Sequence, residues 1–141
     1  MSPPRTRPRP SAPLLKEMGR LAARARERAH APFSGFRVGA ALKTATGEIV
    51  TGCNIENASY GLTMCAERVA VYKAVSEGLT DFDSIAVVAD ADRITPPCGP
   101  CRQILWEFGG NLTVHMADLK GRTRTMRLKD LLPLPFDERN L

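Results

Sequence analysis

Five consecutive apolar residues near the middle of the chain, Ile85 to Ala89, limit the possible folds more than any other stretch. A run of this length without polar alternation is typical of a central strand that is buried on both faces. Such a strand needs a covering layer on each side of its sheet, which helices on both faces provide. The run therefore favours an α/β fold.

Segments of helical and of strand-like pattern alternate around this run. The predicted elements are, in order, a helix over 14–29, strands over 36–43 and 49–56, a helix over 65–77, the strand over 85–89, a helix over 99–108, strands over 112–116 and 122–128, and one helical turn over 129–132. The alternation in the middle predicts parallel neighbouring strands joined by right-handed crossovers. The expected fold is a three-layer α/β sandwich with a five-stranded mixed sheet, formed by residues 14–141 as a single domain.

The N-terminal residues 1–13 differ from the rest of the chain. They hold five prolines among Arg, Ser and Thr, so we expect a disordered or polyproline-like tail. The formal net charge is +5, and removing the charges of Arg5, Arg7 and Arg9 leaves +2 for the remainder. Aromatic residues at only 6% and this small charge argue against a basic and aromatic groove for single-stranded nucleic acid, and no nucleic-acid partner is expected.

Composition also bears on the compartment and on the four cysteines. Hydrophobic residues at 43% and charged residues at 25% are typical of a globular protein, and no apolar stretch is long enough to span a membrane. The basic N-terminus lacks the apolar segment of a secretory signal, so a cytoplasmic, reducing environment is expected. In that environment the cysteines are first interpreted as thiols or metal ligands.

The cysteines are unevenly placed. Cys65 begins one predicted helix, and Cys98 and Cys101 begin another. A Cys-x-x-Cys pair alone is compatible with a redox pair, half of a structural zinc site, or chance. Cys53 points to the strand face opposite to Asn54, among isoleucines, and is most simply a small buried residue. Three well-placed sulfurs predict a catalytic zinc with one open coordination position.

Glu67 and Arg68, which follow Cys65 in the same predicted helix, extend the zinc hypothesis. Side chains in a first helical turn tilt toward the N-terminus, so Cys65 and Glu67 can reach the same ion. A carboxylate there could move protons for a zinc-activated water, or simply favour the helix dipole. Arg68 could offset the excess negative charge of three thiolates on one Zn²⁺, although a surface salt bridge fits the spacing as well.

These residues resemble a known family. Cys65-Ala66-Glu67 and the run from Pro97 to Cys101 match the zinc deaminase signature, an H/C-x-E element followed by P-C-x-x-C. The chain resembles more specifically the small cytidine deaminases that act on free nucleosides. The segments that carry this resemblance are 32–36, 38–42, 51–61, 65–68, 73–78, 98–103 and 131–133. It covers the chain from about residue 14 to the C-terminus.

The resemblance implies a complete set of roles. The reaction would be hydrolytic deamination of cytidine and 2′-deoxycytidine to uridine and 2′-deoxyuridine, with release of ammonia. One Zn²⁺ per subunit would be held by Cys65, Cys98 and Cys101, with Glu67 as the proton carrier. The residues implied to contact the nucleoside are Phe36, which would pack on the pyrimidine ring, Asn54 and Glu56, which would hold the ribose 3′-hydroxyl, and Ala66, Tyr60 and Phe136. The last two would act partly from neighbouring subunits of a homotetramer.

Some residues depart from the family pattern, and two other functions remain open. Pro96 stands where Ser is usual, Pro100 replaces a small residue, and Phe33 replaces a usual Tyr; we expect these changes to tune the site without abolishing it. A deaminase of a cytosine-nucleoside antibiotic shares the zinc motif but not the run over 54–60. A structural zinc or interaction protein would lose no reaction when Glu67 is changed.

Overall fold

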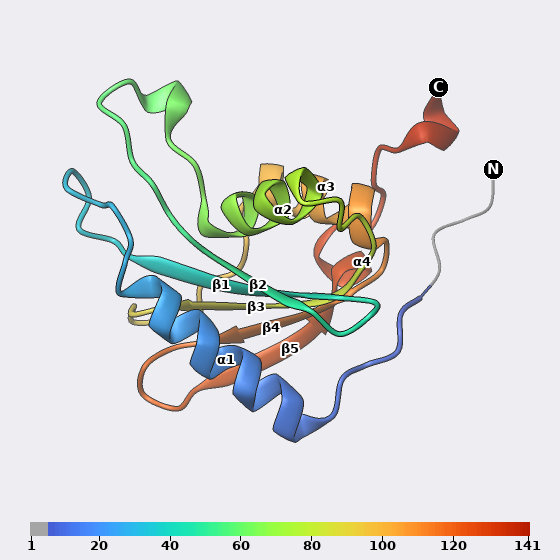
Figure 1. Ribbon diagram of the computed structural model, residues 1–141, viewed down its shortest axis with the longest axis horizontal. Coiled ribbons are helices and arrows are strands. Elements are labelled where there is room, and N and C mark those ends of the chain that lie inside the picture. Colours follow the sequence, from blue (N-terminus) through green and yellow to red (C-terminus); the bar gives the residue numbers. More distant parts are fainter. Residues whose placement is uncertain (1–5) are drawn as a thin grey trace.

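The computed structural model describes residues 6–141 (Figure 1). The elements in this part are helix α1 (Ala12–Arg26), strands β1 (Val38–Thr44) and β2 (Ile49–Cys53), the 3₁₀ helix η1 (Tyr60–Leu62), helix α2 (Ala66–Ser76), strand β3 (Phe82–Ala89), helix α3 (Gly99–Gly109), strands β4 (Thr113–Ala117) and β5 (Thr123–Arg127), helix α4 (Leu128–Leu131) and the 3₁₀ helix η2 (Glu138–Asn140). Within these described residues, no helix combines the length and the apolar character that a membrane crossing requires.

The five strands form one sheet in the order β2-β1-β3-β4-β5. β3 pairs antiparallel with β1 and parallel with β4. At the edges of the sheet, β2 pairs antiparallel with β1, and β5 pairs antiparallel with β4. The prediction of a five-stranded mixed sheet is confirmed. The expectation of parallel neighbours is confirmed for β3 and β4 but is wrong for β2 and β3. These two strands are separated by β1, because the hairpin partner takes the place beside β3.

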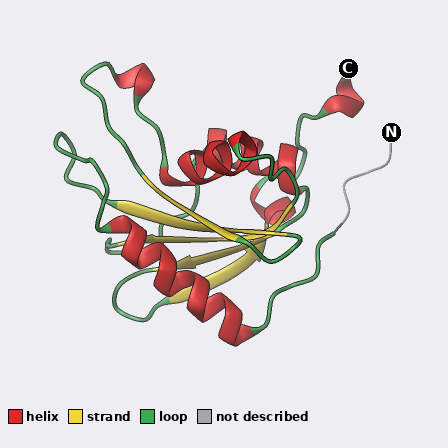
Figure 2. Ribbon diagram, viewed as in Figure 1, coloured by secondary structure: helices red, strands yellow, loops and turns green. Residues whose placement is uncertain are grey.

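The central strand β3 is covered on both faces, as its apolar run predicts. Ile85 and Val87 belong to the larger core, which also contains residues of α2 and α3. Ala86 and Val88 belong to a second core with the buried side of α1. Figure 1 shows α1 on one side of the sheet and α2, α3 and α4 on the other, and Figure 2 shows the same layers by element type. The three-layer prediction is therefore confirmed.

A close backbone approach fixes the start of α2 on the sheet. A Cβ atom built on Gly52 of β2 would lie 2.6 Å from the Ala66 carbonyl oxygen and 2.7 Å from the Ala70 nitrogen. Any side chain at this position would push α2 away from the strand, so glycine allows the contact. The first turn of α2 is thereby held against β2 near the end of the hairpin.

The N-terminal segment is only partly covered by the described residues. The prediction of a disordered tail over 1–13 falls in part on 1–5, which lie outside them. From residue 6 onward the chain has polar partners, and the predicted tail stays a prediction. Thr6 forms an isolated bridge to the segment before β4, and Arg7 forms an ion pair with Asp81. Helix α1 accordingly begins two residues earlier than predicted.

Candidate metal centre and active site

Three cysteines meet where α2 and α3 begin. Cys65 is the N-cap residue of α2, Cys98 is the N-cap residue of α3, and Cys101 lies in the first turn of α3. Their Sγ atoms all lie within 4.8 Å of one another. The Sγ–Sγ distance is 3.7 Å between Cys65 and Cys98 and 3.3 Å between Cys98 and Cys101. The structure thus brings the predicted ligands together, and we call these three residues the cysteine cluster.

Cys53 lies outside the cysteine cluster. Among the described residues, the group whose atoms could hold a metal ion contains only the other three cysteines. The residue is half-buried, so the expectation of a buried side chain is met only in part. Cys53 pairs with Gly39 at the end of β2, and a Cβ atom at Gly39 would face Ala22 of α1, so the Cys53 side chain lies on the α1 face of the sheet, opposite to the starts of α2 and α3. The prediction that this thiol is not a ligand agrees with the geometry.

The spacing and chemistry of the cysteine cluster fit a zinc ion. Tetrahedral zinc binds thiolate sulfur at about 2.3 Å, which places two coordinating sulfurs roughly 3.8 Å apart. Metal binding requires thiolates, and the free N–H groups of helix starts favour that form. Hydrogen bonds from Cys101 and then from Arg68 lower the pKa of Cys65 to about 5, against the opposing effect of burial. Three ligands leave room for a fourth, non-protein one.

Arg68 provides positive charge beside the sulfurs. Its Nη2 donates a hydrogen bond to Cys65 Sγ at 3.3 Å. Its Nε is buried and has no hydrogen-bond partner within residues 6–141. Contact with Cys65 raises the pKa of the guanidinium, which therefore stays charged. Because Arg68 contacts sulfur and forms no ion pair with a carboxylate in this part of the chain, the geometry supports charge compensation over a surface salt bridge.

Glu67 lies beside the cysteine cluster in the first turn of α2. Its side chain is only 4% exposed, and its carboxylate interacts with the Cys101 thiol. Burial, supported by the negative charge on Cys65, raises the pKa of Glu67 to about 7. The carboxyl group can therefore hold or release a proton near neutral pH, which an exposed acid at a helix start would not do. The neighbouring Ala66 side chain is fully buried, so a substrate contact there would have to use its backbone.

Two connecting segments, 30–37 and 54–64, project from the same end of the sheet (Figure 1), and we call them the loop pair. Asn54 joins them through two hydrogen bonds: its Oδ1 accepts from Val38 N at 2.9 Å, and its Nδ2 donates to Phe36 O at 2.8 Å. The amide is only 8% exposed. Both of its polar atoms are thus used to shape the backbone around Phe36.

Glu56 makes the second connection within the loop pair. Its Oε1 accepts from Phe33 N at 3.0 Å and from Ser34 N at 3.1 Å, and its Oε2 accepts from the Ser34 hydroxyl. The Ser34 hydroxyl and then these backbone donors lower the pKa of Glu56, so it is ionised at neutral pH. A cavity of about 350 Å³ lies beside this carboxylate. It is lined by Phe33, Ser34, Glu56, Asn57, Tyr60 and Thr63.

Asn54 and Glu56 hold the same segment of the chain, but not for the reason that the sequence predicts. The sequence predicts both on one face of a strand that extends to residue 56. Strand β2 ends at Cys53, so both residues lie beyond it. They nevertheless hold the same segment, because Asn54 binds the peptide groups on either side of residue 37 and Glu56 binds those of residues 33 and 34.

Comparison with known proteins identifies the family. Residues 14–117 match the sequence profile described as "Cytidine and deoxycytidylate deaminase zinc-binding region". The chain belongs to this deaminase family. The match includes the cysteine cluster and the loop pair, so the two parts of the site described above both lie inside it.

Relatives of this deaminase are similar over most of their length. A protein from Halalkalibacterium halodurans named cytidine deaminase is 49% identical over 124 residues, which cover 87% of this chain and 91% of the relative. A probable cytidine deaminase from Dictyostelium discoideum is 56% identical over 114 residues, covering 80% and 77%. The crystal structure of cytidine deaminase from Burkholderia pseudomallei has a TM-score of 0.83 and 44% identity, covering 86% of this chain and 98% of that chain.

Arg102 has no role predicted from the sequence, but the structure connects it to the segment that holds two of the predicted metal ligands. Its Nε donates to Pro97 O at 2.8 Å, and its Nη1 donates to Leu131 O at 2.9 Å. It therefore ties the residue before Cys98 to the end of α4. The only signal in the sequence was its position directly after Cys101, and its distant partner at residue 131 leaves no local pattern.

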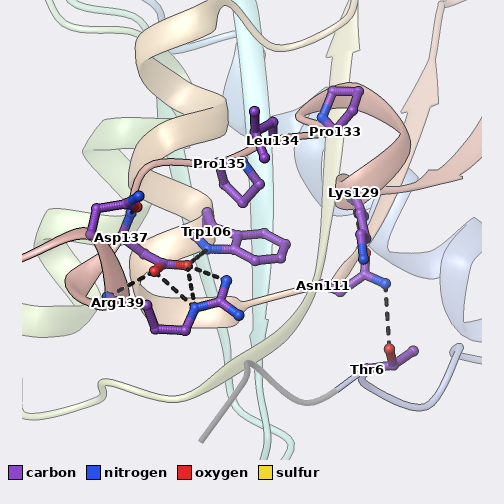
Figure 3. Close-up of a pocket in the computed structure, with 10 residues that line it drawn as sticks. Thr6, Trp106, Asn111, Lys129, Pro133, Leu134, Pro135, Asp137 and Arg139 are labelled. Atoms are coloured by element: carbon purple, nitrogen blue, oxygen red, sulfur yellow. Dashed lines mark hydrogen bonds and ion pairs between the residues drawn. The ribbon is translucent and has the colours of Figure 1, made fainter. Parts of the chain in front are cut away.

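Phe136 lies apart from the loop pair. Its carbonyl oxygen accepts a hydrogen bond from Gln103 Nε2 at 2.6 Å, and its side chain is 59% exposed. Phe136 is not among the described residues that line the cavity beside Glu56. Its sequence neighbours Pro135 and Asp137 line a second cavity of about 400 Å³. In the lining of this cavity, Trp106 Nε1 donates to Asp137 Oδ2 at 3.0 Å (Figure 3). None of the predicted site residues of the deaminase lines that second cavity.

Proposed function

We propose that this protein is a zinc-dependent cytidine deaminase, which converts cytidine and 2′-deoxycytidine to uridine and 2′-deoxyuridine with release of ammonia. The observation that carries this conclusion is the buried Glu67 carboxyl beside a three-cysteine cluster at two helix starts. Membership in the deaminase family, and similarity over most of the chain to proteins named cytidine deaminase, support the substrate class.

In the proposed reaction, Cys65, Cys98 and Cys101 would hold the zinc ion. Zinc held in such a site would supply Lewis acidity, which lowers the pKa of water so that hydroxide is available as a nucleophile near neutral pH. Glu67 takes one proton from the attacking water and delivers it to N3 of the cytosine ring as the C4–O bond forms. It then takes the proton of the new C4 hydroxyl and delivers it to the amino group, which leaves as ammonia when the C4–N bond breaks. A pKa of about 7 suits this carboxyl to both directions of transfer. Arg68 stabilises the thiolate form of Cys65 through its hydrogen bond.

The loop pair is proposed to receive the nucleoside. Glu56 and Asn54 would hold the ribose 3′-hydroxyl, and Phe36 would pack on the pyrimidine ring, with the Ala66 backbone nearby. Three features support these roles: Glu56 is an ionised acceptor that faces a cavity, Phe36 is 40% exposed, and its backbone is fixed by Asn54. An exposed ring on a fixed backbone provides a flat apolar surface against which a base can stack.

The assembly is proposed to be a homotetramer of one deaminase domain, residues 14–141, in the cytoplasm. The side chains of Tyr60 and Phe136 are 85% and 59% exposed, and Leu62 is exposed as well. Neighbouring copies would cover this apolar surface and would let Tyr60 and Phe136 line sites across an interface. The cytoplasmic environment would keep the free thiols of the cysteine cluster reduced.

Zinc content and the loss of cytidine absorbance test the reaction. The proteins to compare are the wild type, Glu67→Gln, and Glu77→Gln, which makes the same change at the exposed end of the same helix. We expect the wild type and Glu77→Gln to bind zinc and to deaminate cytidine. Glu67→Gln should keep the zinc and lose activity by about 10³-fold or more, because it has no proton carrier.

Two outcomes would overturn parts of this proposal. A zinc-loaded wild type that leaves cytidine, deoxycytidine and cytosine-nucleoside antibiotics unchanged would favour a structural zinc protein. Full activity in Glu67→Gln would remove this residue from the reaction. Light scattering after size exclusion measures the assembly separately, and an active monomer would exclude sites shared between subunits.

A further inference from the structure

The hydroxyl group of Ser34 makes two hydrogen bonds at once within the loop pair. Its Oγ donates to Glu56 Oε2 and accepts from Phe36 N at 2.9 Å. A hydroxyl has one donor and two acceptor positions, so the two bonds are compatible. One side chain therefore connects the proposed ribose acceptor directly to the residue that carries the proposed stacking ring.

The two bonds fix different parts of Glu56 and Phe36. The backbone N–H groups of residues 33 and 34 both bind Glu56 Oε1, and the Ser34 hydroxyl binds Oε2. Without the hydroxyl, Oε1 would keep its backbone donors while Oε2 would be free to turn away. The hydroxyl thus sets the direction of the second carboxylate oxygen rather than the presence of the charge.

Phe36 is held on both sides of its Cα atom. Ser34 Oγ binds its N–H, and Asn54 Nδ2 binds its carbonyl oxygen at 2.8 Å. The turn that places Ser34 is closed by Gly35, whose N–H donates to Ala31 O at 2.9 Å and whose φ of 68° favours glycine. The ring of Phe36 therefore extends from a backbone whose two neighbouring peptide groups both have side-chain partners.

We propose that Ser34 is a positioning residue for nucleoside recognition, which holds Glu56 Oε2 and the Phe36 backbone in one relative placement. A nucleoside presents a ribose hydroxyl and a base ring at a fixed separation, so both contacts form together only when their protein partners keep the matching separation. This inference rests on the proposed function. It adds a residue that does not itself need to touch the substrate.

Steady-state kinetics on cytidine and on 3′-deoxycytidine test the inference. The variants are Ser34→Ala, Ser34→Thr, which retains the hydroxyl, and Ser76→Ala as the control. Ser76 Oγ donates to Lys73 O at 2.8 Å on α2, so the control removes an equivalent hydroxyl far along the chain from the loop pair. Zinc content and Tm are measured for each protein: zinc content should not change, and the Tm of Ser34→Ala should fall by no more than about 3 °C, because the bonds that the hydroxyl makes are exposed.

Ser34→Ala should raise KM for cytidine about tenfold, which corresponds to the loss of one charged hydrogen bond, with kcat within about twofold of the wild type. For 3′-deoxycytidine, which lacks the hydroxyl that Glu56 would hold, the increase should be smaller than about threefold. Ser34→Thr should restore most of the KM, and Ser76→Ala should leave both constants unchanged. A merely structural role would raise KM equally for the two nucleosides.

Three results would overturn the inference: an unchanged KM in Ser34→Ala, an equal increase for both nucleosides, or a loss of kcat without a change in KM. Failure of the proposed function gives a different result, because the wild type would then not turn over cytidine. In that case hydrogen exchange of residues 30–38 still measures the connection. Ser34→Ala should speed exchange of the Phe36 amide, and unchanged exchange would contradict the role of the hydroxyl.

Discussion

The cysteine cluster and the loop pair are built from different kinds of interaction. Cys65 and Cys98 are N-cap residues whose carbonyl groups accept the first backbone hydrogen bonds of α2 and α3, both at 3.0 Å. The cluster is thus placed by helix geometry and by packing of the helices on the sheet. In the loop pair, the side chains of Asn54, Glu56 and Ser34 make the connections, and most of the surrounding residues are exposed.

The proposed chemistry and the proposed recognition of the substrate therefore depend on different kinds of interaction. In the cysteine cluster, the hydrogen bonds of the sulfurs within residues 6–141 run to one another and to Arg68, and neither N-cap thiol makes a side-chain cap to its helix. In the loop pair, the same side chains that would meet the substrate also hold the backbone. Changes in the cluster should therefore remove a reaction and leave the fold intact, whereas changes in the loop pair should alter affinity and stability together.

The largest expected effect comes from Cys98→Ser. Serine is a better N-cap residue than cysteine, and Cys98 is exposed, so α3 should form as before. Loss of a ligand should remove zinc and lower activity by more than the roughly 100-fold that loss of an outer partner costs. Zinc content, activity and Tm are compared with those of zinc-stripped wild type, because bound metal itself stabilises a fold.

Cys53→Ser is the matched control for this change. The thiol of Cys53 lies outside the cluster, so zinc and activity should both be retained. Zinc and activity that survive in Cys98→Ser would contradict the three-ligand cluster. A collapse of Tm below that of the zinc-stripped wild type would show instead that the cluster supports the fold, and the contrast with the loop pair would not hold.

The sequence predicted best what depends on regular secondary structure. The buried run over 85–89 predicted the central strand, and the two helix starts predicted where the sulfurs would meet, because N-cap residues and first turns occupy defined positions. The strand order was predicted less well. Insertion of β1 between β2 and β3 depends on which neighbour the hairpin packs against, and residue patterns within single strands do not contain that information.

The loop pair and the C-terminal segment show where prediction from sequence ended. The resemblance named Asn54 and Glu56, but their partners in residues 33–38 are distant in sequence and follow no periodicity. Ser34 and Arg102 were missed for the same reason, since each acts through a contact that only the folded chain creates. Exposed Tyr60 shows a further limit, because the contacts of a side chain that is proposed to meet a neighbouring copy would lie outside its own sequence.

Asn54→Ala should give an intermediate effect and tests the loop pair directly. The change leaves Val38 N and Phe36 O without their side-chain partner, which should cost about 2 kcal/mol and lower Tm by roughly 5–10 °C. KM for cytidine should rise in the same variant while zinc content stays constant. Thr80→Ala, at an exposed position between α2 and β3, is the control for both measurements. A raised KM with an unchanged Tm would show that Asn54 recognises substrate without supporting the backbone.

The smallest expected effect is a pH-dependent one at Asp137, in a third region that is also held by side chains (Figure 3). Hydrogen bonds from Arg139 and then from Trp106 hold the pKa of Asp137 well below its usual range. Because the pKa in the unfolded chain is about 4, the ionised carboxylate stabilises the fold above that pH. This contribution is lost as the pH falls below about 4 toward the folded pKa.

Asp137→Asn should therefore lower Tm by a few degrees at about pH 6 and by less at about pH 3, where the wild type has lost part of the same interaction. Asp130→Asn, on the neighbouring helix α4, is the control variant and is measured at the same pH values. A Tm difference for Asp137→Asn that stays constant across this range would mean that the hydrogen bonds hold the segment without depending on the charge. The contrast between the helix-built cysteine cluster and regions held by side chains would then rest on the loop pair alone.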